Sequence, residues 1–121
     1  MRLSVAQRLF DAPADWHGRT LFRTAAETMT YGAARLHMLR AAAWLQRVHG
    51  IVPGARVAVC LPKTPATLCL MLGAMAAGAC IVPLQFNGPG ERLAAQLASI
   101  RPHLLLTTGA MGARLAEHAG D

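Results

Sequence analysis

The period of the hydrophobic pattern changes along the chain, and each change marks an expected element. Residues 56–61 (RVAVCL) are continuously apolar after the first position, which is typical of a parallel strand covered on both faces. Residues 66–77 are apolar around almost the whole circumference of a helix and predict a buried helix. After Gly78 β-branched residues appear, and residues 79–84 predict a second strand. The pattern therefore indicates a strand–helix–strand unit.

Capping residues define the ends of two helices. Thr30 is a suitable N-cap for a helix that Gly50 would end, and Thr64 is a suitable N-cap for the helix at 66–77, with Pro65 at its first position. Trp44 lies in the first of these helices, where we expect it to pack rather than to bind a ligand. It flanks an apolar stripe at helical spacing, which predicts a buried side: Met38, Ala41, Ala42, Leu45 and Val48.

The rest of the chain continues the alternation of strands and helices. The remaining expected elements are a lead-in at 1–18 with a short helix at 5–10, a hairpin of 20–23 and 27–30, a helix at 91–100, a strand at 103–107 and a helix at 110–118. Short links between alternating strands and helices favour a parallel sheet with right-handed crossovers. The predicted fold class is α/β, a partial doubly wound parallel sheet of three strands with flanking helices, preceded by a small N-terminal hairpin.

Composition and charge exclude several classes of protein. The 121 residues are 54% hydrophobic and 15% charged, unlike a disordered chain. The net charge is +6, but the arginines are scattered and no aromatic residues alternate with them, so nothing indicates specific nucleic-acid binding. Residues 64–90 carry no charge and could span a bilayer by length, but their prolines, glycines and change of pattern at Gly78 favour a buried helix followed by a strand. The expectation is no transmembrane segment.

The cysteines and histidines do not form a recognisable site. Cys60, Cys69 and Cys80 lie nine and eleven positions apart in apolar runs, without a C-x-x-C pair, and predict buried free thiols in a reducing cytosol. The histidines show no metal-ligand spacing. We therefore assign no catalytic residue and no metal ligand, and we expect a cytoplasmic location.

Two motifs, in this order, carry a resemblance to a known family. Thr30-Tyr31 begins a helix within MTYGAARL, and residues 76–79 (AAGA) are followed by residues 82–84 (VPL). Across residues 19–108 the chain resembles the adenylate-forming acid–CoA ligase (AMP-binding, acyl-CoA synthetase) superfamily. The resemblance implies that residues 19–121 are the first part of an N-terminal AMP-binding-type domain, truncated before the phosphate loop, and that 1–18 are a lead-in segment.

The resemblance also draws attention to weak candidates for phosphate binding. Residues 107–114 (TTGAMGAR) partly match the family's T-S-G-T-T-G-x-P-K loop and supply Thr108, Gly109, Gly112 and Arg114. They lack the hydroxyl residues between the glycines, occur too early for the family's order, and have arginine in place of lysine. The favoured interpretation is the end of a strand followed by a helix N-cap. Lys63, where the family often has asparagine, lies beside a helix N-terminus and is the other candidate for an anion.

The function implied by the resemblance is that of an AMP-forming acid–thiol ligase, which activates a carboxylic acid with ATP as an acyl-adenylate and then forms a thioester. ATP, Mg²⁺ and CoA or a carrier thiol are implied for the full-length enzyme, and none is expected on this chain alone, which we predict to be inactive. Its partner would be the remainder of the ligase in cis or trans, and self-association is expected of the isolated chain. The alternatives are a non-catalytic interaction module or split-enzyme half, and a small basic membrane- or nucleic-acid-associated protein.

Overall fold

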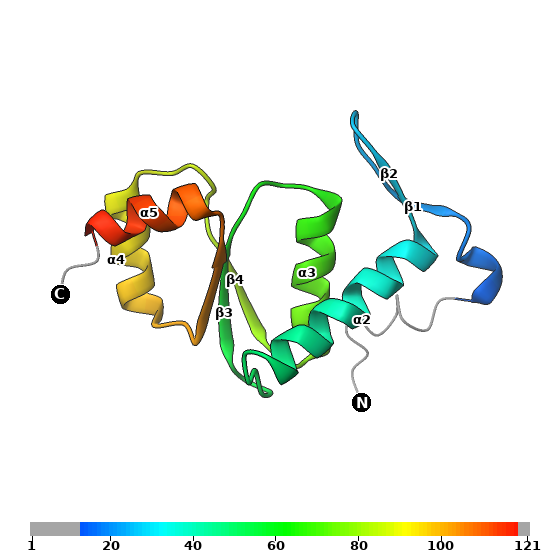
Figure 1. The fold of residues 1–121 in the computed structure, drawn as a ribbon, viewed down its shortest axis with the longest axis horizontal. Coiled ribbons are helices and arrows are strands. Elements are labelled where there is room, and N and C mark those ends of the chain that lie inside the picture. Colours follow the sequence, from blue (N-terminus) through cyan, green and yellow to red (C-terminus); the bar gives the residue numbers. More distant parts are fainter. Residues whose placement is uncertain (1–12, 119–121) are drawn as a thin grey trace.

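Three parallel strands form the centre of the computed structural model, which describes residues 13–118 (Figure 1). β3 (Arg56–Cys60) lies in the middle and pairs with β4 (Cys80–Pro83) on one side and with β5 (Leu104–Thr107) on the other. All three strands run in the same direction, which confirms the predicted parallel sheet. The order β4–β3–β5 requires the chain to cross over β3 between the second and third strands.

The helices cover the two faces of this sheet. α3 (Pro65–Ala76) connects β3 to β4 on one face, and α4 (Gly90–Ile100) connects β4 to β5 on the other, where α5 (Gly109–His118) packs beside it (Figure 1). A change of face accompanies the reversal of direction in the strand order, as right-handed crossovers require. This confirms the doubly wound arrangement.

Alternate side chains of β3 enter different cores because successive residues of a strand point to opposite faces. Val57 and Val59 pack in one cluster with Ala74 of α3, whereas Cys60 packs with Leu93 of α4 in another. Four of the five residues of β3 are buried. The uninterrupted apolar run in the sequence is thus explained by cover on both faces.

A hairpin and a long helix complete the fold on the side of α3. β1 (Thr20–Arg23) pairs with β2 (Thr28–Thr30) in an antiparallel hairpin, preceded by the 3₁₀ turn η1 (Ala14–Trp16), and α2 (Tyr31–Arg47) follows. α2 packs along α3, and Met38 and Cys69 lie in the buried cluster between these helices and the hairpin. The predicted hairpin is confirmed; the helix expected at residues 5–10 lies outside the described residues.

Both predicted N-caps are present. The Thr30 hydroxyl oxygen accepts a hydrogen bond from the Ala33 N–H at 3.2 Å, and the Thr64 hydroxyl oxygen accepts one from the Thr67 N–H at 3.1 Å. Each threonine therefore pairs one of the N–H groups that have no partner inside the first turn of a helix. These bonds explain why both helices begin where the sequence predicts.

Three expectations about burial were wrong, whereas Trp44 packs as expected: its ring, although exposed, lies against His49 at a centroid distance of 4.4 Å. Val48 is 65% exposed, because α2 ends at Arg47 and the buried stripe ends at Leu45. Cys80 is exposed at the start of β4, at the edge of the three-stranded sheet. α3 is not covered on every side, since its Leu68 is 39% exposed.

Candidate functional site

The carboxyl ends of β3 and β5 are the first place to look for a site. These strands are neighbours. After β3 the chain continues into α3 on one face of the sheet, and after β5 it continues into α5 on the other face. In open α/β sheets ligands bind at such a switch point, in the crevice outside the carboxyl ends of the strands. Both sets of candidate residues from the sequence lie beside these two strand ends.

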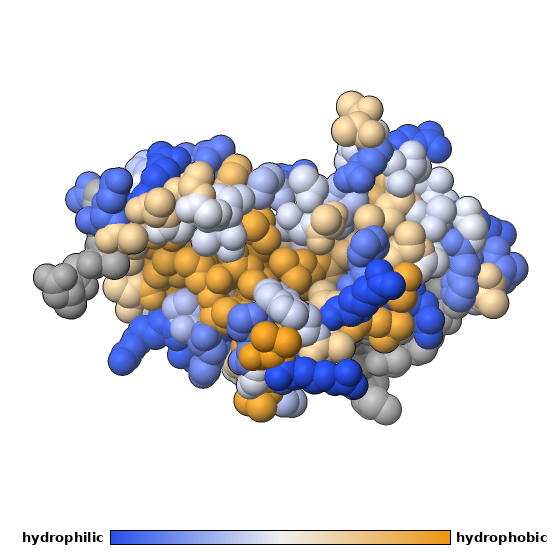
Figure 2. Space-filling view, viewed as in Figure 1, coloured by the Kyte–Doolittle hydropathy of each residue, from blue (hydrophilic) through white to orange (hydrophobic). Residues whose placement is uncertain are grey.

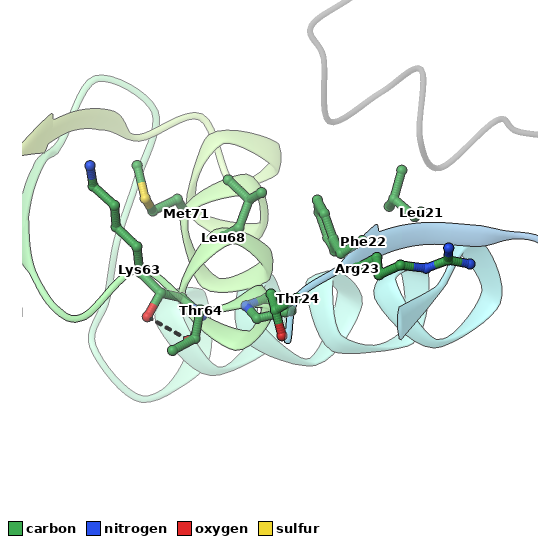
Figure 3. Close-up of a pocket in the computed structure, with 10 residues that line it drawn as sticks. Leu21, Phe22, Arg23, Thr24, Lys63, Thr64, Leu68 and Met71 are labelled. Carbon is green, nitrogen blue, oxygen red and sulfur yellow. Dashed lines mark hydrogen bonds between the residues drawn. The ribbon is translucent and has the colours of Figure 1, made fainter. Parts of the chain in front are cut away.

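Lys63 lies in the loop after β3, where it is exposed and lines two open grooves. The hairpin groove, of about 550 Å³, lies between the hairpin and α3; Figure 3 shows Phe22 and Leu68 on its two sides, with Lys63 extending beside Met71. The sheet-end groove, of about 720 Å³, lies over the ends of β3 and β4 and includes Phe86. The sheet-end groove is lined mostly by apolar side chains, whereas apolar and polar residues line the hairpin groove in equal number, Arg23 among them. Neither lining contains an acidic residue.

The residues after β5 are already engaged with one another. The Thr108 hydroxyl oxygen accepts from the Met111 N–H at 3.2 Å, and the Thr108 carbonyl oxygen accepts from the Gly112 N–H at 2.9 Å. Gly109 and Gly112 lie inside α5 rather than in a loop, and a guanidinium nitrogen of Arg114 lies 3.4 Å from the Met111 sulfur. The expected helix N-cap is confirmed, while phosphate binding at these residues stays a prediction.

The two sets of candidates do not converge on one cavity. Lys63 precedes α3 on one face, and Thr108 leads into α5 on the other. Neither groove that Lys63 lines includes Thr108, Gly109, Gly112 or Arg114. The geometry therefore supplies Lys63 between two grooves, with Arg23 in the wall of one of them, together with a separate helix start.

Thr107 is the residue at this edge that sequence reasoning missed. Its hydroxyl donates to the Cys60 carbonyl oxygen at 2.9 Å and so ties the ends of β5 and β3 together. The Cys60 thiol lies 3.6 Å from the Gln85 carbonyl oxygen. Burial raises the pKa of the Cys60 thiol, although the hydrogen bond with Thr107 acts in the opposite direction. A thiol with a raised pKa holds little thiolate, so Cys60 is a structural residue rather than an activated nucleophile.

The described residues do not bring together the groups that a reaction centre would need. Within residues 13–118, no group of three or more His, Cys, Asp or Glu side chains could hold a metal ion. None of the helices in that part of the chain is long and apolar enough to cross a membrane. What the edge offers is surface for binding: two partly apolar grooves that share Lys63, with Arg23 in the lining of the hairpin groove.

Comparison with known proteins gives a consistent result. The profile of a family described as AMP-binding enzyme matches residues 9–121. Novobiocin biosynthesis protein H of Streptomyces niveus is 38% identical over 94 residues, which are 78% of this chain and 16% of that protein. The Mycobacterium tuberculosis protein named fatty-acid–CoA ligase FadD21 is 35% identical over 111 residues, which are 89% of this chain and 18% of that protein.

A solved structure extends the likeness to the fold. ATP-bound MatB from Rhodopseudomonas palustris matches with a TM-score of 0.84 at 26% identity, over 98% of this chain and 24% of the MatB chain. The present chain thus spans less than a fifth of the two relatives and about a quarter of the solved structure.

Proposed function

This chain belongs to the AMP-binding enzyme family, and we propose that it is the first part of the N-terminal domain of an AMP-forming acid–thiol ligase. Such a ligase would activate a carboxylic acid with ATP and pass the acyl group to CoA or to a carrier thiol. The observation that carries the proposal is the family match over residues 9–121, with the same fold over 98% of the chain in MatB. The two alternatives, an interaction module and a small basic membrane- or nucleic-acid-associated protein, are not favoured by these matches.

In this proposal residues 19–121 act as a scaffold, with residues 1–18 leading into it. The chain supplies three parallel strands of a doubly wound sheet and the loops at its carboxyl edge. Support comes from the nature of that edge, where the strand ends are tied to each other by Thr107 and the groove walls are apolar. No catalytic step is assigned to any residue between Ala14 and Glu117.

The described residues fit ATP and Mg²⁺ poorly. At the start of α5 the Met111 N–H already bonds to the Thr108 hydroxyl, and the segment has no hydroxyl residues between its two glycines. No acidic cluster in that part of the chain could hold the metal. We therefore propose that the nucleotide, Mg²⁺ and the acceptor thiol bind to segments of the ligase outside this chain, and that this chain alone is inactive.

The partner in this proposal is the remainder of the ligase, in cis or in trans. Figure 2 shows a continuous apolar area between α3 and the α4/α5 pair, where the sheet lies in Figure 1. Exposed apolar surface of this kind, next to a sheet edge, promotes association. We propose that the isolated chain self-associates for this reason, and that the ligase acts in the cytoplasm, where the thiols of Cys60 and Cys69 would remain reduced.

A pyrophosphate-release assay tests the proposal. With ATP, Mg²⁺ and a panel of carboxylic acids, the 121-residue chain should give only background release, and a chain extended by the sequence that follows it in the genome should turn over. Substantial release by the 121-residue chain that Gly109→Ala or Arg114→Ala abolishes would contradict the proposal. That result would instead establish a phosphate site at the start of α5.

A further inference from the structure

The two outer strands of the three-stranded sheet differ in how their free edges are built. Among residues 13–118, β4 and β5 each pair with β3 on one side only, so each presents a row of backbone N–H and C=O groups on its other side. Such a row is a template for a further strand, and proteins protect true edges with charges, prolines or bulges. The residues along each edge therefore indicate whether another strand belongs there.

The free edge of β4 is protected by a proline. The Cys80 N–H donates to the Ala55 carbonyl oxygen at 2.8 Å, and the Leu84 N–H, just after β4, also donates to β3 at 2.8 Å. Because the backbone groups of successive residues alternate between the two sides of a strand, those of Ile81 and Pro83 point away from β3. Pro83 has no N–H to offer a further strand, and sheets tolerate proline mainly at such outward-facing edge positions. β4 is therefore suited to end the sheet.

The free edge of β5 lacks this protection. The His103 N–H donates to the Arg56 carbonyl oxygen at 2.8 Å, so by the same alternation the backbone groups of Leu104 and Leu106 point away from β3. The four residues of β5, LLLT, include no proline and no charge, and their register with β3 is regular, without a bulge. The outward side of β5 can therefore form a complete ladder with another strand.

The side chains of β5 are also those of an interior strand. Leu105 packs in the cluster with Cys60 and Leu93, whereas Leu104 and Leu106 pack in the cluster on the opposite face of the sheet. A short strand that is apolar on both faces is typical of the interior of a parallel sheet. β5 thus combines the sequence of an interior strand with an edge position among the described residues.

The handedness of the connections leads to the same edge. α4 connects β4 to β5 by a right-handed crossover on one face of the sheet, and α5 packs beside α4 on that face (Figure 1). A right-handed connection through α5 continues in the same direction, so the strand that it reaches lies beyond β5, on the side away from β3. The relatives are more than four times as long as the segments that they share with this chain, so they contain further chain to form such a strand.

We propose that the free edge of β5 is the docking site for the remainder of the ligase, which adds a strand parallel to β5. The N–H and C=O groups of Leu104 and Leu106 form the ladder with the added strand. Figure 2 shows the apolar area where β5, orange in Figure 1, runs between α3 and the α4/α5 pair, and the added strand covers part of it. The inference rests on the proposed function, which supplies the partner, and it specifies the edge and the direction of the contact.

Hydrogen exchange resolved to single amides tests the inference in the chain extended by the sequence that follows it in the genome. The Leu104 and Leu106 amides should exchange about as slowly as those of Leu105 and Thr107, because every amide of an interior strand belongs to a ladder. In an edge strand the outward-facing amides would instead exchange at least about a hundredfold faster than their neighbours.

β4 provides the matched control in the same sample. Its Ile81 amide faces the edge with the proline and should exchange at least about a hundredfold faster than the Val82 amide, which faces β3. Fast exchange at Leu104 and Leu106, or equally slow exchange at Ile81 and Val82, would overturn the inference. Protection at Leu104 and Leu106 that disappears on dilution would also overturn it, because a second copy of the chain would then be the partner of β5.

Pyrophosphate release by the same extended chain separates this inference from the proposed function. Slow exchange at Leu104 and Leu106 without turnover would support the docking edge and count against the ligase. Turnover with fast exchange at these two amides would support the ligase and overturn the docking edge.

Discussion

Replacing Gly73 with alanine should destabilise the fold, because α2 and α3 approach each other most closely at this glycine. An added Cβ would lie 2.6 Å from the Ala41 Cβ, 2.8 Å from the Met38 carbonyl oxygen and 3.2 Å from the Ala42 nitrogen. All three atoms belong to α2, and two of them are backbone atoms that no side-chain rotation can move. The contacts can be relieved only by moving one helix away from the other.

Two opposing terms set the magnitude. Alanine favours a helix interior over glycine by about 1 kcal/mol. Overpacking a close contact typically costs about 1–3 kcal/mol and occasionally more, and contacts with backbone belong at the upper end of that range. The expected net loss for Gly73→Ala is therefore about 1–2 kcal/mol, which corresponds to a fall in Tm of roughly 5–10 °C for a chain of this size.

Gly112 provides a matched control in the interior of another helix. A Cβ there would meet only the Thr107 Cγ2, at 3.9 Å, which is an ordinary van der Waals distance. Gly112→Ala should therefore stabilise the chain by up to about 1 kcal/mol through helix propensity alone. The two variants contain the same chemical change, so opposite signs would isolate the effect of the α2–α3 contact.

Pulse proteolysis in urea can measure the free energy of unfolding for both variants, because it reads the unfolded fraction directly. A double-mutant cycle with Ala41→Gly should show a favourable coupling of about 1 kcal/mol, since removing the Ala41 Cβ relieves the shortest contact. If Gly73→Ala were as stable as the parent chain, or gained as much as Gly112→Ala, the two helices could not be in contact at Gly73. The reasoning from this contact would then be refuted.

Two further predictions concern side chains at the ends of the sheet. Arg56→Ala should lower the free energy of unfolding by about 1–2 kcal/mol, with Arg92→Ala nearly neutral, because the Arg56 guanidinium donates to the carbonyl oxygens of Ile100, which ends α4, and of Arg101, which caps it, at 3.0 and 2.9 Å; urea unfolding measures both. Iodoacetamide should modify the exposed Cys80 well before Cys60 and Cys69, because burial raises the pKa of the latter two thiols; equal rates for all three thiols would refute this order. The contribution of Cys60 and Cys69 to the stability of the fold should be lost as pH rises above about 9, because the unfolded chain then releases protons that the folded chain retains.

Local signals in the sequence predicted the elements and their order well. Thr30 and Thr64 determine where two helices begin through bonds to N–H groups three residues away, so the information is complete within one turn. The uninterrupted apolar run of β3 predicted cover on both faces, because only a strand between two layers needs apolar residues at every position. The alternation of strands and helices then left few topologies to consider.

Burial at the edges of elements could not be predicted in the same way. Cys80 stands in an apolar run like that of Cys60, but only the pairing order reveals that β4 lies at the edge of the sheet. Val48 continues the helical stripe by spacing, but the helix ends one residue earlier. In both cases exposure depends on where neighbouring elements stop, and that information lies far away in the sequence.

The candidate site shows the same division between local and distant information. The sequence placed Lys63 beside a helix N-terminus and Thr108 at the end of a strand, and both positions are correct. The hairpin groove was not foreseen, because Phe22 and Leu68 line the same groove only through the packing of the hairpin beside α3. A groove between segments more than forty positions apart leaves no pattern in either segment.

The uneven cover of α3 explains why its sequence suggested burial on every side. Cys69, Leu72 and Ala74 are buried against α2 and the sheet, while Leu68 and Met71 line the open hairpin groove. An apolar side chain stabilises a fold by about 25 cal/mol for each Å² that it removes from water, so leucine on the open side contributes little to this chain by itself. Since the relatives are more than four times as long as their matched segments, the apolar residues on the open side of α3 fit a helix that belongs to a larger domain.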